Sequence, residues 1–114
     1  MKDCLFCNII NKNVPAKIVF ENDKVLAFED IEPQAPVHVL IIPKKHIMSI
    51  NDIEFEDKEV CGEILLAAKK IAVDLKIKDS GYRAIFNTNE DGGQTVFHIH
   101  MHLLGGRKLK WPPG

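Results

Sequence analysis

The segment Phe97–Leu104 constrains the fold more than any other part of the chain, because apolar residues and histidines alternate along it. Side chains of a β-strand point to opposite faces with a period of two, so this pattern predicts a half-buried strand. The buried face is expected to hold the apolar residues Phe97, Ile99, Met101 and Leu103. His98, His100 and His102 are expected together on the other face. A row of imidazoles is poorly suited to a core and therefore predicts a functional site.

Two chemistries fit these histidines. In the first, His-x-His on a strand supplies two ligands of a catalytic zinc, a third His lies nearby, and water takes the open position. In the second, one His attacks as a nucleophile while a neighbour holds its other ring nitrogen. His38 lies on a second apolar segment, Val37–Ile42. If the two segments pair, four histidines converge, and the spacing alone leaves both chemistries open.

The remaining pattern predicts one short helix over Cys4–Asn13 and one long helix over about Glu54–Leu75, capped by Ser49, Asn51 or Asp52. A loop is expected over residues 88–94. The strands are predicted over Lys17–Phe20, Lys24–Glu29, Val37–Ile42, Tyr82–Asn87 and Phe97–Leu104. Because hairpin-length links join several strands, we expect an α+β fold with a mostly antiparallel sheet of about five strands.

Composition limits the function classes. The chain has 114 residues, of which 46% are hydrophobic and 27% charged, and these values indicate one compact domain over residues 1–114. A net charge of −1 offers no strong field for nucleic acid or for an anionic membrane. No signal peptide or apolar span of about 20 residues is recognisable. With an odd cysteine count, the sequence predicts a soluble protein of a reducing cytoplasm.

The pair Cys4-x-x-Cys7 is a separate signal. Such a pair is typical of half a zinc site, of a redox pair, or of two buried thiols. A redox role would require a thioredoxin-like unit, which the pattern of this chain does not predict.

The motif His98-Ile99-His100-Met101-His102-Leu103-Leu104 resembles the His-x-His-x-His signature of the histidine triad (HIT) nucleotide-binding family. Further blocks resemble that family in the same order along the chain. They are Pro15–Ile18, Ala27–Ile31, Gln34–His38, Ile42–His46, Tyr82-Arg83, Asp91–Val96, Gly105–Arg107 and Trp111–Gly114. The resemblance covers nearly the whole chain, and its ending is most similar to the purine nucleoside phosphoramidase branch.

The resemblance implies a hydrolase that cleaves the P–N bond of purine nucleoside 5′-phosphoramidates. His100 would be the nucleophile and would form a nucleotidyl-histidine, while a backbone carbonyl of the triad orients its other nitrogen. His102 would bind a phosphate oxygen, and His38 would lie near the phosphate or the leaving group. His98 and the Thr95 hydroxyl complete the implied catalytic set. No cofactor is required for this chemistry.

The same resemblance implies a nucleotide pocket and a homodimer whose two sheets join. Asp30 would accept hydrogen bonds from the ribose, and Asn87 would lie near the ribose and phosphate. Gln94 and Thr95, in the Gly-rich turn, would meet phosphate charge. The apolar slot for the base would consist of Phe6, Ile9, Phe28 and Ile31. The expected ligand is a purine nucleoside monophosphate or phosphoramidate, with neither nucleic acid nor membrane as a partner.

Some relatives carry a structural zinc, and the implied ligands here are Cys4, Cys7, His46 and His98. Such a Cys2His2 set fills a tetrahedral zinc and leaves no open position. Three other functions remain open from the sequence. They are a zinc-dependent nucleotide hydrolase that uses the triad as ligands, a dinucleoside polyphosphate hydrolase, and a nucleotide-binding adaptor.

Overall fold

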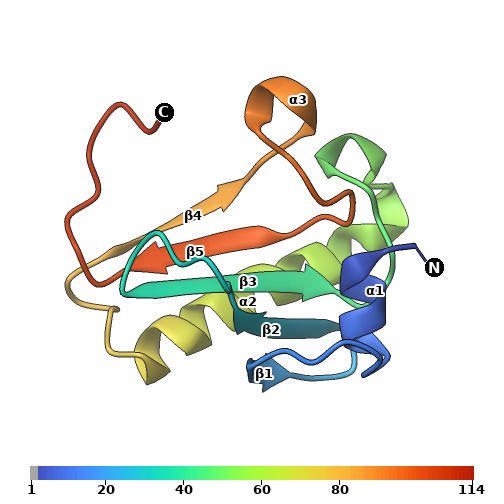
Figure 1. Cartoon of the computed structure of the whole chain (residues 1–114), viewed down its shortest axis with the longest axis horizontal. Coiled ribbons are helices and arrows are strands. Elements are labelled where there is room, and N and C mark those ends of the chain that lie inside the picture. The colour runs from blue at the N-terminus through green and yellow to red at the C-terminus, as the bar shows by residue number, and fades with distance from the viewer. Residues whose placement is uncertain (1–2) are drawn as a thin grey trace.

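The computed structural model describes residues 3–114, and its centre is an open five-stranded antiparallel sheet (Figure 1). The strands are β1 (Ile18–Glu21), β2 (Val25–Glu29), β3 (Val37–Pro43), β4 (Tyr82–Phe86) and β5 (Met101–Gly105). Their order across the sheet is β1-β2-β3-β5-β4, and every neighbouring pair is antiparallel. The predicted α+β class and strand number are confirmed. The one crossover in this order places β5 beside β3.

Helices cover the two faces of the sheet unequally. The long helix α2 (Lys58–Asp74) lies behind the sheet, and the short helix α1 (Leu5–Ile10) lies in front of one end of it (Figure 1). The core against α2 combines side chains of the helix with one face of the strands; it includes Ile64, Ala68, Ile71, Val39, Ile41, Met101 and Leu103. A smaller core packs beneath α1; it consists of Phe6, Ile9, Leu26, Phe28, Leu40 and Ile42. The front face is therefore left partly open.

Helix α2 begins later than the sequence predicts. Glu54 and Asp57 form a capping box around a 3₁₀ turn, Phe55–Asp57, and regular α-helix starts only at Lys58. The proposed cap Ser49 instead caps a separate 3₁₀ turn, Ile50–Asp52, whose Asn51 N–H donates to the Ser49 hydroxyl. The physical reason is that local side chain-to-backbone bonds close tight turns before a helix can nucleate.

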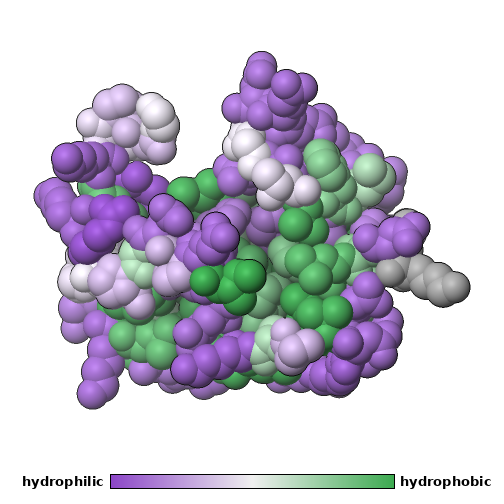
Figure 2. Space-filling model, viewed as in Figure 1, coloured by the Kyte–Doolittle hydropathy of each residue, from purple (hydrophilic) through white to green (hydrophobic). Residues whose placement is uncertain are grey.

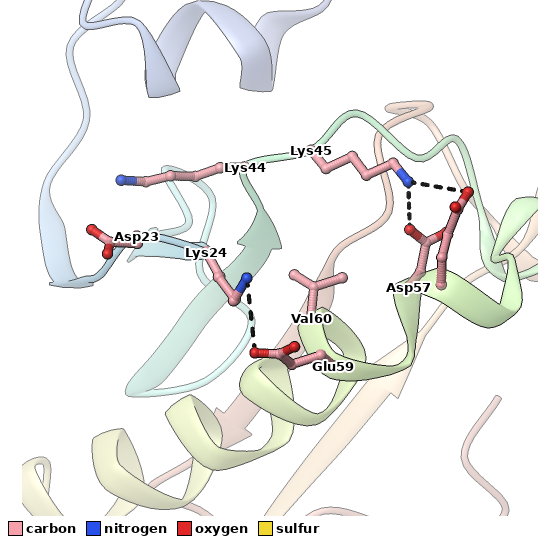
Figure 3. Close-up of a pocket in the computed structure, with 8 residues that line it drawn as sticks. Asp23, Lys24, Lys44, Lys45, Asp57, Glu59 and Val60 are labelled. Carbon is pink, nitrogen blue, oxygen red and sulfur yellow. Dashed lines mark hydrogen bonds and ion pairs between the residues drawn. The ribbon is translucent and has the colours of Figure 1, made fainter.

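A charged hollow of about 290 Å³ lies between the end of β3 and the start of α2 (Figure 3). The Lys45 ammonium contacts the buried Asp57 carboxylate, and Lys24 reaches Glu59 over 3.9 Å. Lys44 pairs with Glu21 at 2.9 Å. Each lysine around the hollow therefore has an acidic partner. The Lys45 and Lys24 pairs tie the start of α2 to the sheet, whereas the Lys44 pair links the end of β3 to β1.

Strand β5 begins at Met101, so the prediction of a strand from Phe97 is wrong over its first four residues. The ladder on one side ends with β4 at Phe86, which pairs with Met101. On the other side β3 ends at Pro43, which has no N–H to donate. The Ile99 N–H donates to the Ile47 carbonyl instead, at 2.6 Å. Outside the ladder, Phe97 is 43% exposed rather than buried.

A short helix, α3 (Asn89–Gly92), stands where the sequence predicts a loop. Gly93 follows it with φ of 84°, the left-handed conformation that commonly ends a helix. The early C-terminal end of α1 has a similar cause: Lys12 takes a positive φ of 64°, and the helix ends at Ile10 rather than at Asn13. Within residues 3–114, no helix is both long enough and apolar enough to cross a membrane.

Gly105 makes a close contact that allows a test of the packing. A Cβ added there would lie 2.7 Å from Ile77 Cδ1 and 3.3 Å from Ile77 Cβ. We expect Gly105→Ala to lower the free energy of unfolding by about 1–3 kcal/mol, because the buried strand has no room for the methyl group. Urea unfolding of Gly105→Ala, Ile77→Val and the double variant measures this. If the clash with Ile77 Cδ1 destabilises Gly105→Ala, the free energy of unfolding of the double variant falls by less than the sum of the two single decreases, because Val lacks Cδ1. If the two single decreases in the free energy of unfolding simply add, the proposed clash with Ile77 is contradicted.

Candidate active site

Three histidines beside the open face of the sheet, His38, His100 and His102, define the site. His38 on β3 and His102 on β5 lie diagonally across the ladder, because His38 pairs with Leu104 and Leu40 pairs with His102. Diagonal neighbours on one face are within reach of each other's side chains. The two rings meet with His38 Nε2 2.9 Å from His102 Nδ1. The predicted convergence is thus confirmed for His38 and His102, whereas His98, expected on the same face, lies against Cys4 and His46 instead.

His100 lies just before β5 and is oriented by the backbone. Its Nδ1–H donates to the His98 carbonyl oxygen at 2.8 Å. A neutral imidazole has one N–H, so the other nitrogen, Nε2, keeps a free electron pair. The ring is 7% exposed and packs edge-on against Phe6, with centroids 5.0 Å apart. His100 therefore offers an unprotonated nitrogen in a fixed direction.

Burial sets the charge of these rings. It is the first cause that lowers the pKa of His38 and of His100 below the usual 6.5. Burial lowers the pKa of His102 to about 4, helped by the neighbouring His100 and His38. The rings are consequently neutral at pH 7, and a neutral imidazole is the form that can attack an electrophile.

A cavity of about 310 Å³ opens beside His100 and His102. The predicted nucleotide-pocket residues that line it are Phe6, Ile9, Phe28, Asp30, Ile31, Asn87 and Thr95. Ile31 is 95% exposed and so belongs to the rim. Apolar surface gathers beside α1 on this side of the molecule (Figure 2). The cavity is thus apolar at one end and carries the imidazoles at the other.

A second hollow, of about 530 Å³, adjoins the first through two shared residues, Asn87 and His102. His38 and Gln34 line it, together with Pro113 of the C-terminal segment. The two hollows meet at the histidines, so a ligand with two parts could place one on each side of His102.

Gln94 does not line either hollow. Its side-chain Nε2 donates to the Met48 and Val96 carbonyls at 2.7 and 3.1 Å, and its Oε1 accepts from the Asn89 N–H at 3.0 Å. All three bonds go to backbone. The buried Gln94 side chain therefore shapes the turn that presents Thr95, and the implied contact of this turn with phosphate stays a prediction.

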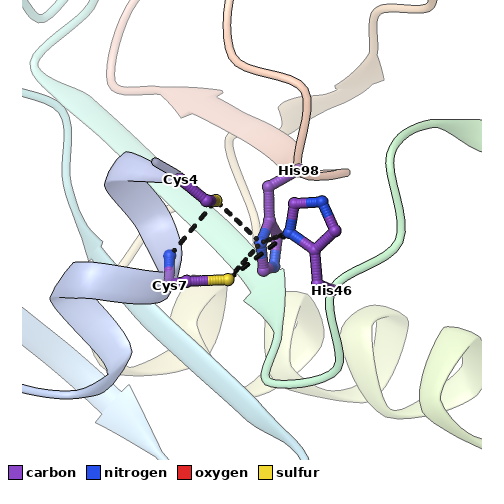
Figure 4. A group of neighbouring side chains, drawn as sticks. All are labelled: Cys4, Cys7, His46 and His98. Atoms are coloured by element: carbon purple, nitrogen blue, oxygen red, sulfur yellow. Dashed lines mark hydrogen bonds between the residues drawn. The ribbon is translucent and has the colours of Figure 1, made fainter. Parts of the chain in front are cut away.

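His98 turns away from the cavity, toward α1. Its Nε2–H donates to the Pro43 carbonyl at 2.8 Å, which leaves Nδ1 unprotonated. That Nδ1 lies 3.1 Å from His46 Nδ1, 3.4 Å from Cys4 Sγ and 3.6 Å from Cys7 Sγ (Figure 4). Cys7 Sγ is also 3.4 Å from His46 Nδ1. The four implied zinc ligands thus meet, although they come from three segments of the chain.

The separations fit a tetrahedral zinc. Zinc bonds of about 2.1 Å to nitrogen and about 2.3 Å to sulfur give tetrahedral edges of about 3.4 Å between nitrogens and about 3.6 Å between nitrogen and sulfur. The observed N···N distance of 3.1 Å and N···S distances of 3.4–3.6 Å are close to these values. Two thiols and two imidazoles are also the donors that zinc prefers.

A second group of residues of metal-ligand type consists of Asp30, His38 and His102. This group does not suit a metal, because of the position of the proton on His38. The Gln34 backbone N–H donates to His38 Nδ1 at 3.0 Å, so the neutral ring carries its proton on Nε2. Nε2 is the atom that faces Asp30 and His102. A metal there would have to displace that proton. The Gln34 contact is a functional feature that the sequence did not reveal, because a backbone N–H has no residue signature.

Comparisons with known proteins agree with this site. A family model described as HIT domain matches residues 11–109. The purine nucleoside phosphoramidase of Escherichia coli K12 is 49% identical over 108 residues, which are 95% of this chain and 91% of that protein. An uncharacterised HIT-like protein of Synechocystis is 50% identical over 99% of this chain and 98% of its own. A crystal structure of a HIT family hydrolase from Legionella pneumophila Philadelphia 1 superposes with a TM-score of 0.97 at 55% identity, covering 98% of this chain and 100% of that one.

The family match spans most of the chain and includes the histidine segment, both cavity-facing imidazoles and the turn that carries Thr95. The resemblance seen in the sequence is therefore confirmed, and the chain belongs to the HIT family.

Proposed function

We propose that this HIT-family enzyme hydrolyses the P–N bond of purine nucleoside 5′-phosphoramidates through a covalent intermediate on His100. The observation that carries the proposal is the orientation of His100. Its Nδ1–H donates a hydrogen bond to the His98 carbonyl at 2.8 Å, and its ring lines the apolar cavity. The similarity to the Escherichia coli purine nucleoside phosphoramidase supports the choice of substrate class.

The two hollows suggest how the substrate lies. The purine enters the apolar end, beside the packed pair Phe6 and Phe28, and the ribose hydroxyls reach Asp30. The phosphorus then lies between His100 and His102, and the amine extends into the hollow lined by His38 and Pro113. An apolar slot with few polar groups recognises a purine by its flat shape.

Two displacements complete the reaction. The free pair on His100 Nε2 forms a bond to phosphorus, the P–N bond of the substrate breaks, and the departing nitrogen takes up a proton from the solvent to leave as an amine. Water then attacks the same phosphorus, the bond to His100 breaks, and a nucleoside monophosphate is released. The water that attacks in this second step returns a proton to the solvent. His102 donates a hydrogen bond to the phosphate, and the Thr95 hydroxyl adds a second donor where negative charge develops.

The site geometry favours this mechanism over a catalytic zinc held by the triad. His98 points to the Cys4–Cys7 pair, whereas His100 and His102 point into the cavity. Residues on opposite sides of one segment cannot ligate one ion together. The dinucleoside polyphosphate and adaptor functions have no contact in their favour among the described residues, and they become outcomes of the experiment below.

His100→Ala tests the covalent step. We expect turnover of adenosine 5′-phosphoramidate to be lost while nucleoside monophosphate affinity stays within about tenfold, because only a bond made during reaction disappears. Intact-protein mass spectrometry after a rapid, acid-free quench should show one added adenylyl group on the wild type and none on His100→Ala.

Thr95→Ser is the matched control, because it keeps the hydroxyl and should keep the adduct. An adenylyl adduct on His100→Ala would contradict the assignment of the nucleophile. A wild-type protein that binds nucleotide without turnover would favour the adaptor function.

We also propose that Cys4, Cys7, His46 and His98 hold a structural zinc. Neither cysteine is in a disulfide, and Nδ1 of His98 is already unprotonated. Zinc binds cysteine as the thiolate, so binding would release the thiol protons. A reducing cytoplasm would keep these thiols available. When bound, zinc would tie α1, the segment after β3 and the segment before β5 together. Since the His98 carbonyl orients His100, the same ion would steady the nucleophile without taking part in the reaction.

Metal analysis of gently purified protein tests this site. We expect about one equivalent of zinc in the wild type and in Cys61→Ala, and less than about 0.1 equivalent in Cys7→Ala. Cys61 is the control because it lies on α2, away from the cluster. A wild type with less than about 0.1 equivalent would refute the zinc site.

A homodimer with joined sheets is the third part of the proposal. Strand β4 lies at the edge of the sheet and could pair with its copy across a two-fold axis. Helix α2 also carries apolar residues on its outer side, where Leu65 and Leu66 are each 61% exposed and Val73 is 50% exposed. Gly62, on the same stripe, has no atom within 4 Å of an added Cβ. A second copy of the chain would cover this stripe.

Leu65→Glu tests the dimer. A buried charge at the interface should raise the dimer dissociation constant by at least about tenfold in sedimentation equilibrium. Phe55→Glu is the control, because Phe55 is 81% exposed but precedes α2. A wild type that sediments as a monomer at micromolar concentration would exclude this arrangement.

A further inference from the structure

We propose that Arg107 is a positioning residue of the active site, which holds Gln34 so that the Gln34 backbone N–H fixes the ring tautomers of His38 and His102. The kinetic consequence rests on the proposed phosphoramidate hydrolysis. The tautomer consequence does not, and it can be measured without any substrate.

The first link joins Gln34 to His38. The Gln34 N–H donates to His38 Nδ1 at 3.0 Å. A ring nitrogen that accepts a hydrogen bond carries no proton, so the neutral His38 ring has its proton on Nε2. The Asp30 carboxylate favours the same tautomer, because its Oδ2 lies 3.4 Å from His38 Nε2. The other oxygen of Asp30 accepts from the Glu32 N–H at 2.8 Å, which holds the carboxylate in place.

The second link joins His38 to His102. His38 Nε2 and His102 Nδ1 are 2.9 Å apart, and since His38 is the donor, His102 Nδ1 is the acceptor. The neutral His102 ring must then carry its proton on Nε2. This is the tautomer that offers an N–H to an anionic phosphate oxygen. In the reverse tautomer His102 would present a lone pair to that oxygen, and the contact would be repulsive.

The third link holds Gln34 itself. Gln34 lies in the segment between β2 and β3, outside any helix or strand. Arg107 donates two hydrogen bonds to the Gln34 carbonyl oxygen, from Nε at 3.2 Å and from Nη2 at 3.0 Å. A third guanidinium bond, from Nη1 to the Lys108 carbonyl at 3.1 Å, fixes the direction of the group. Lysine could not reproduce this planar fork.

The residue before Arg107 supports the same contact. Gly106 has φ of +91°, and a Cβ added there would lie 2.8 Å from Pro36 Cβ. The chain after β5 therefore passes directly against the segment that carries Gln34, with no room for a side chain. Because Arg107 and Gln34 are exposed, their bonds add little to global stability. What they determine is the direction of the Gln34 N–H, which three successive hydrogen bonds connect to the proposed phosphate site.

The test measures tautomers directly. Long-range ¹H–¹⁵N correlation spectra of ¹⁵N-histidine protein at pH 7 distinguish Nε2–H from Nδ1–H rings. The wild type should show Nε2–H for both His38 and His102. Arg107→Ala and Arg107→Lys should show a mixture at both rings, and Gln34→Pro, which lacks the N–H, should show the same loss.

Arg83→Ala is the matched control, because Arg83 donates to the Lys110 carbonyl of the same C-terminal segment but does not contact Gln34. Gln34→Ala is a second control for the spectra, since it keeps the backbone N–H. Both should keep the wild-type pattern. Thermal unfolding should place Arg107→Ala within a few degrees of the wild type.

In the kinetic arm, Arg107→Ala should lower kcat about threefold to tenfold with KM within about twofold, because the lost donor acts mainly on developing charge. Wild-type spectra with Nδ1–H at His38, or unchanged spectra for Arg107→Ala, would overturn the proposal. A changed KM with unchanged kcat would overturn the catalytic role. If the wild type does not hydrolyse phosphoramidates, the proposed function fails while the spectra still decide the tautomer link.

Discussion

The pairing of β3 with β5 is the constraint on which the site depends. These strands are distant in sequence, yet the crossover in strand order makes them neighbours at the centre of the sheet. One face of the pair packs under α2 and the other carries His38 and His102. Because side chains alternate across a strand, the same register that buries Val39 and Leu103 must present the histidines on the opposite face. A slip of one residue would bury the imidazoles and expose the core.

Backbone atoms, rather than other side chains, orient most of the imidazoles. The carbonyl of His98 holds His100, the carbonyl of Pro43 holds His98, and the N–H of Gln34 holds His38. His98 belongs to two sites at once, since its ring joins the cysteine cluster and its carbonyl orients the candidate nucleophile. This arrangement connects the cluster beneath α1 to the cavity through a single residue. Burial of the rings then keeps them neutral, as nucleophilic attack requires.

Much of the fold could be predicted, and the errors have identifiable causes. Periodicity located every strand and the long helix, because burial on one face leaves a direct trace in the sequence. It failed at Phe97, where alternation continues but β4 has ended and Pro43 cannot donate. It failed at Ser49 and Glu54, where capping bonds choose between turn and helix. Gln94 was assigned to the ligand from its place in a Gly-rich turn, yet all of its bonds go to backbone.

The sequence by itself determined the chemistry that is available: alternating histidines, a cysteine pair, and enough motif resemblance to indicate the family. It determined these because residue type and spacing are local properties. The resemblance implied a role for each histidine, but only the tertiary structure shows how the three are separated in space. His98, His100 and His102 are equivalent in the motif, but the chain leaves the ladder before Met101, so His98 turns to Cys4 and Cys7 while the other two face the cavity. The contact of Arg107 with Gln34 could not be predicted either. It joins a side chain to a backbone carbonyl 73 residues away, and every residue has such a carbonyl, so no residue type marks the partner.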